Sequence, residues 1–303
     1  RLDIRVSVVP SYHGETVVLR LLTDNAGIFT LDSFGFREAD RSKIERALRR
    51  PSGLIRVTGP TGSGKTSTLY AFLKLLTTSE VSIITIEDPI EYAIPALTQV
   101  QVNAKTGLTF ATGLRSMLRQ DPNIIMVGEI RDTETAAIAV HTALTGHLLL
   151  TTLHTSDAAT TLPRLMDMGV DPYLIASTMS LAIGQRLLRR LCCECKVEVE
   201  ISAAQQVLFA QLPLQKMITA GETFYRAEGC DVCGGAGYLG RVCINEVLAM
   251  DDSLRAAVME RAAASEIKKR AIERGMTPML EDAVKKARRG ETTLEEVLRT
   301  MYE

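Results

Sequence analysis

Hydrophobic and polar positions follow different patterns along the successive parts of this 303-residue chain. Near the amino terminus, apolar and polar residues alternate over 2–9 and again over 17–22, with a turn near His13 and Gly14. Alternation with a period of two is typical of strands that bury one face. Residues 1–33 therefore predict two strands, which are only part of a sheet, and we expect the chain to begin inside that domain.

A second pattern occupies the middle of the chain. Apolar, β-branched runs alternate with helical stretches, and the runs lie at 54–58, 82–86, 124–128 and 148–152. This alternation is typical of a parallel sheet covered by helices. We expect a linker over 34–50 and an α/β core over 51–191.

The remaining residues divide into two parts. Residues 192–243 hold all six cysteines and have little periodicity, which indicates a small, loop-rich insert with little core of its own. Residues 244–303 have a helical pattern, with Pro278 in a first turn and a capping box from Thr292 to Glu295. We interpret the basic run 285–289 as a solvated helix face, because 11 basic and 11 acidic residues cancel from Asp251 onward.

Charge and hydropathy narrow the possible functions. The chain has 35 basic and 36 acidic residues, so it has no overall positive field that would favour nucleic acid as a partner. Residues 135–156 carry no Asp, Glu, Lys or Arg, but Thr, His and Gly interrupt the hydrophobicity that a spanning helix requires. We therefore expect no transmembrane segment.

One motif predicts a nucleotide ligand. Every specified position of the phosphate loop G-x-x-x-x-G-K-[ST] is matched between a strand-like run and a helix-like run that opens at Ser67. Lysine at its place in this motif reaches the β- and γ-phosphates, and the following hydroxyl binds Mg²⁺. The residues of the loop are Gly59, Pro60, Thr61, Gly62, Ser63, Gly64, Lys65 and Thr66.

Acidic residues at strand ends predict hydrolysis of that nucleotide. Glu129 ends an apolar strand, the position of a Walker B acid that holds Mg²⁺ directly or through water. Glu87, Asp88 and Glu91 follow another strand, and one of these acids is expected to orient or deprotonate the attacking water. No guanine-reading Asn-Lys-x-Asp motif is present, so ATP is favoured.

Four segments resemble the secretion-superfamily ATPases. Residues 87–91 resemble the "Asp box" of that family and residues 145–155 its "His box". Residues 128–136 and 114–122 are also similar to the family. Within it, the chain resembles the type IV pilus assembly ATPase and the type II secretion ATPase. The resemblance covers almost the whole chain and implies a RecA-like core, preceded by the remainder of a PAS-like domain over 1–33.

The resemblance also implies roles for individual residues. Glu91 corresponds to the general base and Glu87 to a supporting acid, while His147 and His154 correspond to nucleotide-sensing residues near the γ-phosphate. The family's arginines supply positive charge to the transition state, and in the hexamer the amino-terminal domain closes over the nucleotide. The matching arginines are Arg5 and Arg20 in the amino-terminal strands, and Arg115, Arg119 and Arg131 in the core.

The cysteines predict a structural metal site. Cys192-x-x-Cys195 and Cys230-x-x-Cys233 form two knuckles separated by 34 residues, a set compatible with four thiolates on one tetrahedral Zn²⁺. Cys243 is read as a non-ligand, and so is Cys193, although its neighbour Cys192 leaves the choice of first ligand open. Within the family that the chain resembles, the pilus retraction ATPase lacks this four-cysteine element. The element therefore disfavours a retraction role for this chain.

Three functions are therefore considered. The favoured one is a cytoplasmic hexameric motor, peripheral to the bacterial inner membrane, that hydrolyses ATP and acts on a membrane platform protein to assemble type IV pili. The second is the same motor in a type II secretion or DNA-uptake pseudopilus. The third is a nucleic-acid translocase with a RecA-like core, which the neutral charge disfavours.

Overall fold

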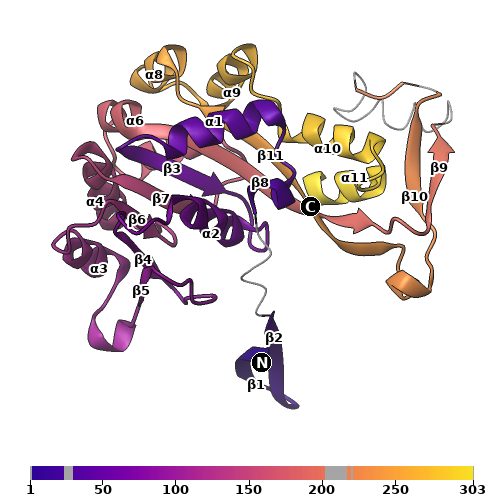
Figure 1. The fold of residues 1–303 in the computed structure, drawn as a ribbon, viewed down its shortest axis with the longest axis horizontal. Helices are drawn as coiled ribbons and strands as arrows, with labels where there is room; N and C mark the ends of the chain where they lie inside the picture. The colour runs from indigo at the N-terminus through magenta and orange to yellow at the C-terminus, as the bar shows by residue number, and fades with distance from the viewer. Residues whose placement is uncertain (1, 24–29, 202–216, 220, 303) are drawn as a thin grey trace.

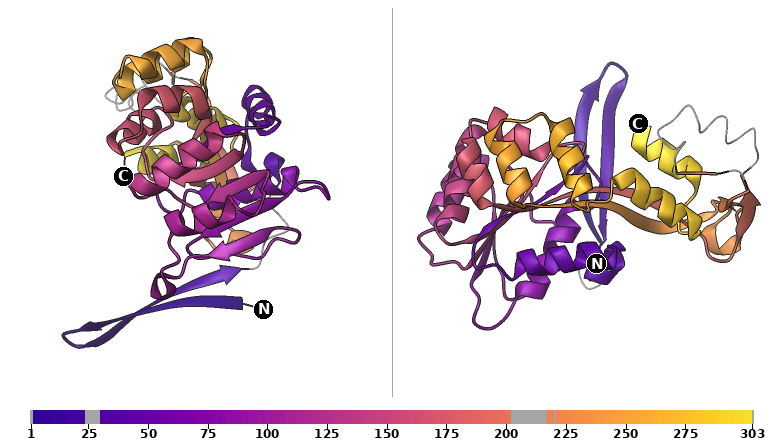
Figure 2. Two further views of the ribbon diagram at one scale, coloured as in Figure 1. Left: turned by 90° about the vertical axis from the view of Figure 1, so that its left-hand side faces the viewer. Right: turned by 90° about the horizontal axis from the view of Figure 1, so that it is seen from above.

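The computed structural model describes residues 2–23, 30–201, 217–219 and 221–302. Two strands begin the chain, β1 (Leu2–Ser11) and β2 (Gly14–Thr23), and they pair antiparallel from Leu2↔Thr23 to Ser11↔Gly14. The two strands and the turn that the sequence predicts are therefore confirmed. Figure 2 shows this hairpin extending away from the rest of the molecule, and its apolar residues, such as Val8 and Val18, are exposed.

The core is a seven-stranded sheet with the strand order β11-β8-β3-β7-β6-β4-β5 (Figure 1). All the pairings are parallel except the antiparallel pairing of β11 with β8. The four predicted strands are confirmed as β3, β4, β6 and β7, whereas three further strands escaped the sequence pattern. The strands are β3 (Gly53–Thr58), β4 (Ile83–Glu87), β5 (Thr98–Gln101), β6 (Ile124–Val127), β7 (Leu148–Leu153), β8 (Met179–Leu191) and β11 (Tyr238–Ala249).

Helices cover both faces of this sheet, as alternating strands and helices require. One face packs on α1 (Glu38–Leu48) and α2 (Lys65–Leu76), and the 3₁₀ turn η1 (Leu31–Phe34) contributes Leu31 to the same core. The helices on the other face share a second apolar core and are α3 (Phe110–Met117), α4 (Thr133–Leu144), α5 (Thr161–Asp167), α6 (Pro172–Thr178), α8 (Asp252–Met259) and α9 (Ala264–Glu273). A further 3₁₀ turn, η2 (Ala104–Thr106), precedes α3.

The parallel register brings several strand ends to one edge of the sheet. Thr58, the last residue of β3, pairs with Leu153 of β7, and Val127 of β6 pairs with both Thr151 of β7 and Ile86 of β4. The loops that follow β3, β7, β6 and β4 therefore leave from this same carboxyl edge. Loops at this edge are the ones that bind ligands in open α/β sheets.

The cysteine-containing insert is built on the two longest strands of the sheet. It contains β9 (Lys196–Glu200), β10 (Thr223–Ala227) and the 3₁₀ turn η3 (Asp231–Cys233), and it returns to the sheet through β11. The predicted boundary at 243 falls inside β11, because this strand buries a continuous run of residues and so has no alternating pattern to mark it in the sequence. Phe224 and Ile201 pack with residues of α10 (Met279–Arg288) and α11 (Leu294–Tyr302), so the insert shares a core with these helices.

The carboxyl-terminal helices were predicted, but their details differ from the prediction. The helices α8 and α9 belong to the core of the main sheet, whereas α10 and α11 belong to the core of the insert. Pro278 is the residue before α10, and α11 is capped by Thr293, which accepts a hydrogen bond from the Glu296 N–H, instead of by Thr292. The Thr292 hydroxyl instead donates to the carbonyl of Arg189.

The basic run 285–289 is not uniformly solvated. Lys286 is 2% exposed, and its ammonium donates to Asp282 at 2.9 Å and to the carbonyl of Cys243. The interpretation of the whole run as a solvated face is therefore wrong at this position, because the helix turns Lys286 towards β11. The balance of charges over the carboxyl-terminal helices does not show which lysine or arginine side chain points into the protein.

A second buried cation lies in the central strand β3. Arg56 has no exposed surface, and its guanidinium nitrogens have no hydrogen-bond partner among the described residues. Burial lowers the pKa of Arg56 to about 9, which leaves it charged at neutral pH. No described helix combines the length and the apolar composition needed to cross a bilayer.

Candidate nucleotide site and cysteine cluster

The phosphate loop connects β3 to α2 at the carboxyl edge of the sheet. Gly59 and Gly64 have φ angles of +149° and +86°, a region that favours glycine, and a Cβ atom at Gly59 would lie 2.3 Å from the carbonyl oxygen of Gln185. Gly64 is the residue before α2, so the positive end of the helix dipole points into the loop. The loop therefore has the backbone geometry of an anion site.

Two side chains of the loop also fit a phosphate ligand. The Lys65 ammonium donates to the carbonyls of Gly59 and Pro60, both at 2.9 Å, and the Ser63 hydroxyl is buried without a hydrogen-bond partner among the described residues. Burial lowers the pKa of Lys65, and the nearby carboxylate of Glu129 opposes this shift. Within the described part of the chain, the lysine is held only by carbonyls and the buried hydroxyl has no partner, and a polyphosphate can satisfy both groups.

Gln185, which the sequence analysis did not single out, holds the phosphate loop in place from the neighbouring strand β8. Gln185 of β8 has no exposed surface, accepts a hydrogen bond from the Thr68 hydroxyl at 2.8 Å and donates to the Ser63 carbonyl at 2.8 Å. These bonds join the loop and the first turns of α2 to the strand beside β3. A glutamine within an otherwise apolar run was the available signal, because a buried amide requires polar partners.

Glu129 follows β6 and lies at the centre of an ionic network. Arg131 approaches it at 2.5 Å and His154 at 3.3 Å, while Arg131 also lies 3.9 Å from Asp88. The hydrogen bond that Arg131 donates to Glu129 raises the pKa of Arg131. The structure therefore brings together Glu129, the second histidine of the His box, and the acidic segment after β4.

Backbone anchors hold these loops in position. Thr58 at the end of β3 donates to the carbonyl of Leu153 at 2.9 Å and accepts from the N–H of Thr155 at 3.1 Å. Thr152 donates to the carbonyl of Gly128 at 2.6 Å. The loops after β6 and β7 are thus tied to neighbouring strands.

The acids after β4 have different surroundings. Glu87 is 2% exposed, and its carboxylate accepts hydrogen bonds from Tyr70, from Thr85 at 2.5 Å and from Gln99 at 3.1 Å. Glu91 is exposed. Glu91 is therefore open to a water molecule in this conformation, as is the exposed Asp88, whereas Glu87 is not.

The remaining predicted residues are spread more widely. Arg115 is ion-paired with Glu134 at 2.6 Å on α4, and Arg119 is exposed after the end of α3. The backbones of Arg5 and Arg20 are register partners in the hairpin, away from the sheet. Thr66 and Ser67 are half-buried in the first turn of α2.

His147 is not brought to this edge. It precedes β7, and its carbonyl accepts a hydrogen bond from the N–H of Gly53 at the start of β3. The six residues of β3 span roughly 20 Å at the usual rise of a strand. The structure therefore does not support a place for His147 near the phosphate loop of its own chain, because the His box runs the full length of β7.

The four predicted cysteines converge at the base of the insert. All four sulfur atoms lie within 4.8 Å of one another, and three pairs lie at 3.8 or 3.9 Å. Four thiolates at about 2.3 Å from a tetrahedral ion are separated by about 3.8 Å, so the spacing fits such an ion. The cluster consists of Cys192, Cys195, Cys230 and Cys233.

The structure resolves the choice between neighbouring cysteines. Cys192 belongs to the cluster, whereas Cys193 is exposed and its sulfur contacts Glu194, and Cys243 is buried in β11. The Cys233 sulfur also accepts backbone hydrogen bonds from Cys230 at 3.2 Å and Gly237 at 3.1 Å. Burial opposes ionisation, but these bonds lower the pKa of Cys233 to about 6 and favour the thiolate that a metal requires.

The fold and the site together define a class. A parallel sheet with a phosphate loop, a strand-end glutamate and a histidine at the adjacent strand end is the arrangement of a P-loop ATPase. Residues 1–299 match the family model described as "Type II/IV secretion system protein", and the chain belongs to this family.

Relatives within the family include both expected kinds of motor. The chain is 49% identical over 98% of its length to type II secretion system protein E of Xanthomonas campestris, covering 52% of that protein. It is 46% identical over 98% of its length to the type IV pilus assembly ATPase PilB of Thermus thermophilus, covering 33% of that protein. The chain thus spans about half or less of the length of these two relatives.

Solved structures have the same fold. The pilus retraction motor PilT with bound ADP matches 99% of this chain and 74% of that chain, with a TM-score of 0.70 and 28% sequence identity. The ATPase DotB of Legionella pneumophila matches 98% of this chain and 71% of that chain, with a TM-score of 0.68 and 24% identity. The likeness to DotB concerns the fold alone.

Proposed function

We propose that this chain is the motor part of a hexameric ATPase that hydrolyses ATP to drive type IV pilus assembly at the bacterial inner membrane. The observation that supports it most is the meeting of the phosphate loop, Glu129 and His154 at the ends of adjacent parallel strands. The names of two relatives, a type IV pilus assembly ATPase and a type II secretion system ATPase E, agree with this chemistry.

The catalytic roles follow from what each group can reach. Lys65 neutralises the β- and γ-phosphates, and Thr66 with Glu129 holds Mg²⁺, which neutralises phosphate charge when bound. Glu91 accepts the proton of the attacking water, and Glu87 keeps its place as a buried supporting acid. His154 responds to the γ-phosphate through its contact with Glu129.

Positive charge beyond Lys65 comes from arginines. Arg131 lies beside Glu129, where its guanidinium would add positive charge near the phosphates of a bound nucleotide. Arg5 and Arg20 complete the site when the amino-terminal hairpin closes over a nucleotide in the assembled ring. Arg115 and Arg119 are exposed on the core, and we propose that they add positive charge for the nucleotide.

The cysteine cluster binds structural Zn²⁺. The sulfur spacing, the two N–H donors to Cys233 and the small core of the insert support this assignment. The motor is cytoplasmic and peripheral to the membrane, and its partner is a platform protein of the machine.

A second candidate function is supported by the 49% identity to a type II secretion protein. The same motor would then drive a secretion pseudopilus. A deletion strain distinguishes these roles, since loss of surface pili indicates pilus assembly and loss of secreted enzymes indicates secretion.

Purified protein tests the enzymatic proposal directly. Lys65→Ala should abolish ATP hydrolysis, and Glu129→Gln should retain ATP binding while losing most turnover. DNA should not stimulate hydrolysis, and stimulation by DNA would favour a translocase. Full hydrolysis by Lys65→Ala would refute the site.

A further inference from the structure

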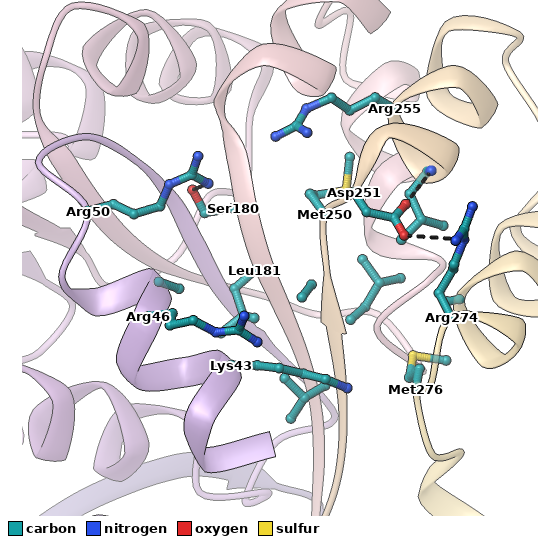
Figure 3. Close-up of a pocket in the computed structure, with 16 residues that line it drawn as sticks. Lys43, Arg46, Arg50, Ser180, Leu181, Met250, Asp251, Arg255, Arg274 and Met276 are labelled. Carbon is teal, nitrogen blue, oxygen red and sulfur yellow. Dashed lines mark hydrogen bonds and ion pairs between the residues drawn. The ribbon is translucent and has the colours of Figure 1, made fainter. Parts of the chain in front are cut away.

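A cavity of about 480 Å³ lies at the opposite edge of the sheet from the phosphate loop. It opens between α1, the start of β8, the end of β11 and the helices α8 and α9 (Figure 3). We name it the basic pocket after its cationic rim, which consists of Lys43, Arg46, Arg50, Arg255 and Arg274. Arg50 precedes β3 and Ser180 is the second residue of β8, whereas the phosphate loop follows the other end of β3.

The cations of this pocket are only partly neutralised. Of the described residues that line the pocket, Asp251 is the single carboxylate, and it pairs with Arg274 at 3.6 Å and caps α8 through the N–H of Leu254. Among the described residues, Arg46 and Arg50 have no carboxylate partner. Arg46 donates to the carbonyl of Ser42, and Arg50 donates to the hydroxyl of Ser180.

The orientation of the arginines indicates a ligand between them. Figure 3 shows the guanidinium groups of Arg50 and Arg255 pointing towards each other across the pocket. Arg255 is fixed in this direction by the carbonyl of Ala176 at 3.0 Å and by Asp252 at 3.2 Å. Cations at the end of α1 suit its helix dipole, but Arg255 lies in the first turns of α8, where the dipole disfavours a cation.

The floor of the pocket is apolar. Leu181, Leu248 and Leu254 are almost completely buried, and Met250 and Met276 also line the cavity. A cavity of this size exceeds what inorganic phosphate needs and lies within the usual range for small-molecule sites. Guanidinium groups bind phosphates in paired, planar geometry, and an apolar floor accepts a ring.

From these features we propose that the basic pocket binds an organic phosphoanion of nucleotide size. The phosphates lie between Arg46, Arg50 and Arg255, and the apolar part lies on the floor. Bound there, the ligand joins α1 to α8 and α9. This bridge supplements the hydrogen bond from Lys43 to the carbonyl of Gly275, which is 3.0 Å long.

Photolabelling with an azido derivative of ADP tests this proposal on the whole chain. In the wild type, we expect label in two places, near the phosphate loop and in a peptide that contains 248–255. Arg46→Ala and Arg50→Ala should each reduce label in the second peptide by about tenfold, as loss of a charged hydrogen bond predicts. Label near the phosphate loop should not change, which also shows that the variants are folded.

Arg49→Ala is the matched control, because Arg49 is an exposed cation on the same segment that does not line the pocket. It should keep both labels. Displacement of the second label by pyrophosphate indicates a soluble ligand, and displacement only by phosphatidylglycerol vesicles indicates a lipid headgroup. Label confined to the phosphate loop, or a second label that survives both arginine substitutions, would overturn the proposal.

Discussion

Glu87 and Glu91 are four residues apart, but their surroundings suit them to different roles in the site. Glu87 has both carboxylate oxygens occupied by Tyr70, Thr85 and Gln99, whereas Glu91 is exposed after β4. A general base must accept a proton from water, so its lone pairs must be free. This difference supports Glu91 as the base.

Amide substitutions separate the two acids. Glu91→Gln should lower the rate of hydrolysis by about 100-fold or more, with nucleotide binding retained. Glu87→Gln should mainly lower the melting temperature, because the amide would place a donor against Tyr70 and Thr85. Steady-state kinetics and thermal melts measure both effects, and an intact rate in Glu91→Gln would move the base to Glu87.

The buried charge of Arg56 should destabilise the folded protein. Its guanidinium is buried and unpartnered among the described residues, and its pKa remains high enough to keep the charge at pH 7. Replacing a buried charge with an apolar side chain of similar size is often stabilising. Arg56→Met should raise the free energy of unfolding by about 1–4 kcal/mol.

Denaturant unfolding of Arg56→Met checks this expectation. Arg49→Met is the control, since it removes an equally basic but exposed side chain and should change stability little. If Arg56→Met unfolds more easily than the wild type, the guanidinium has a stabilising partner.

At the scale of elements, the insert should depend on its metal. Removing Zn²⁺, or replacing Cys230 with Ser, should disorder the insert, because metal–sulfur bonds supply what its small core lacks. ATP binding should survive, since the phosphate loop belongs to the main sheet. Elemental analysis should find one zinc per chain, and hydrogen exchange should locate the loss of order.

Cys193→Ser and Cys243→Ser are the controls for the zinc prediction, because neither sulfur belongs to the cluster. They should keep the metal. A metal-free chain with an ordered insert and full thermal stability would contradict the assignment.

The stability of the junction between β8 and α11 should depend on pH. Glu296 is 1% exposed and accepts hydrogen bonds from Arg189 and Arg299. Burial opposes them, but these bonds lower the pKa of Glu296 to about 2 from 4.5. Its stabilisation is therefore present above about pH 4.5 and is lost as the pH falls towards 2.

Acid unfolding of Glu296→Gln tests this linkage. The variant should be less stable than the wild type at pH 7, and the difference should shrink as the pH falls below 4.5. A constant difference across that range would show that the carboxylate charge is not responsible.

The sequence predicted those elements whose pattern is local. Strands β3, β4, β6 and β7 are short apolar runs with clear ends, and the phosphate loop and four cysteines are fixed spacings. By contrast, β8 and β11 were missed because their burial depends on partners distant in sequence. Gln185 and the inward turn of Lys286 were missed for the same reason. The position of His147 before β7 was not evident either, because a motif does not show which end of a strand faces the ligand.

At the scale of the whole molecule, the hairpin β1–β2 leaves apolar residues uncovered and carries two predicted catalytic arginines. We expect Arg5→Ala or Arg20→Ala to impair turnover more than ATP binding, since charge counts most in the transition state. If the hairpin acts on a neighbouring subunit, mixing Arg5→Ala with Lys65→Ala chains should restore part of the activity. Unchanged kinetics of both arginine variants would remove them from the mechanism.

Three functional parts of the molecule depend on the register of β8, which limits where residues can be inserted or deleted. Along its 13 residues, Ser180 lines the basic pocket, Gln185 holds the phosphate loop, and Leu191 precedes the first cysteine of the cluster. One residue inserted into this strand would turn every following side chain to the opposite face. Insertions and deletions should therefore be tolerated in the turns that join strands, and a β8 of altered length should disable the loop and the cysteine cluster together.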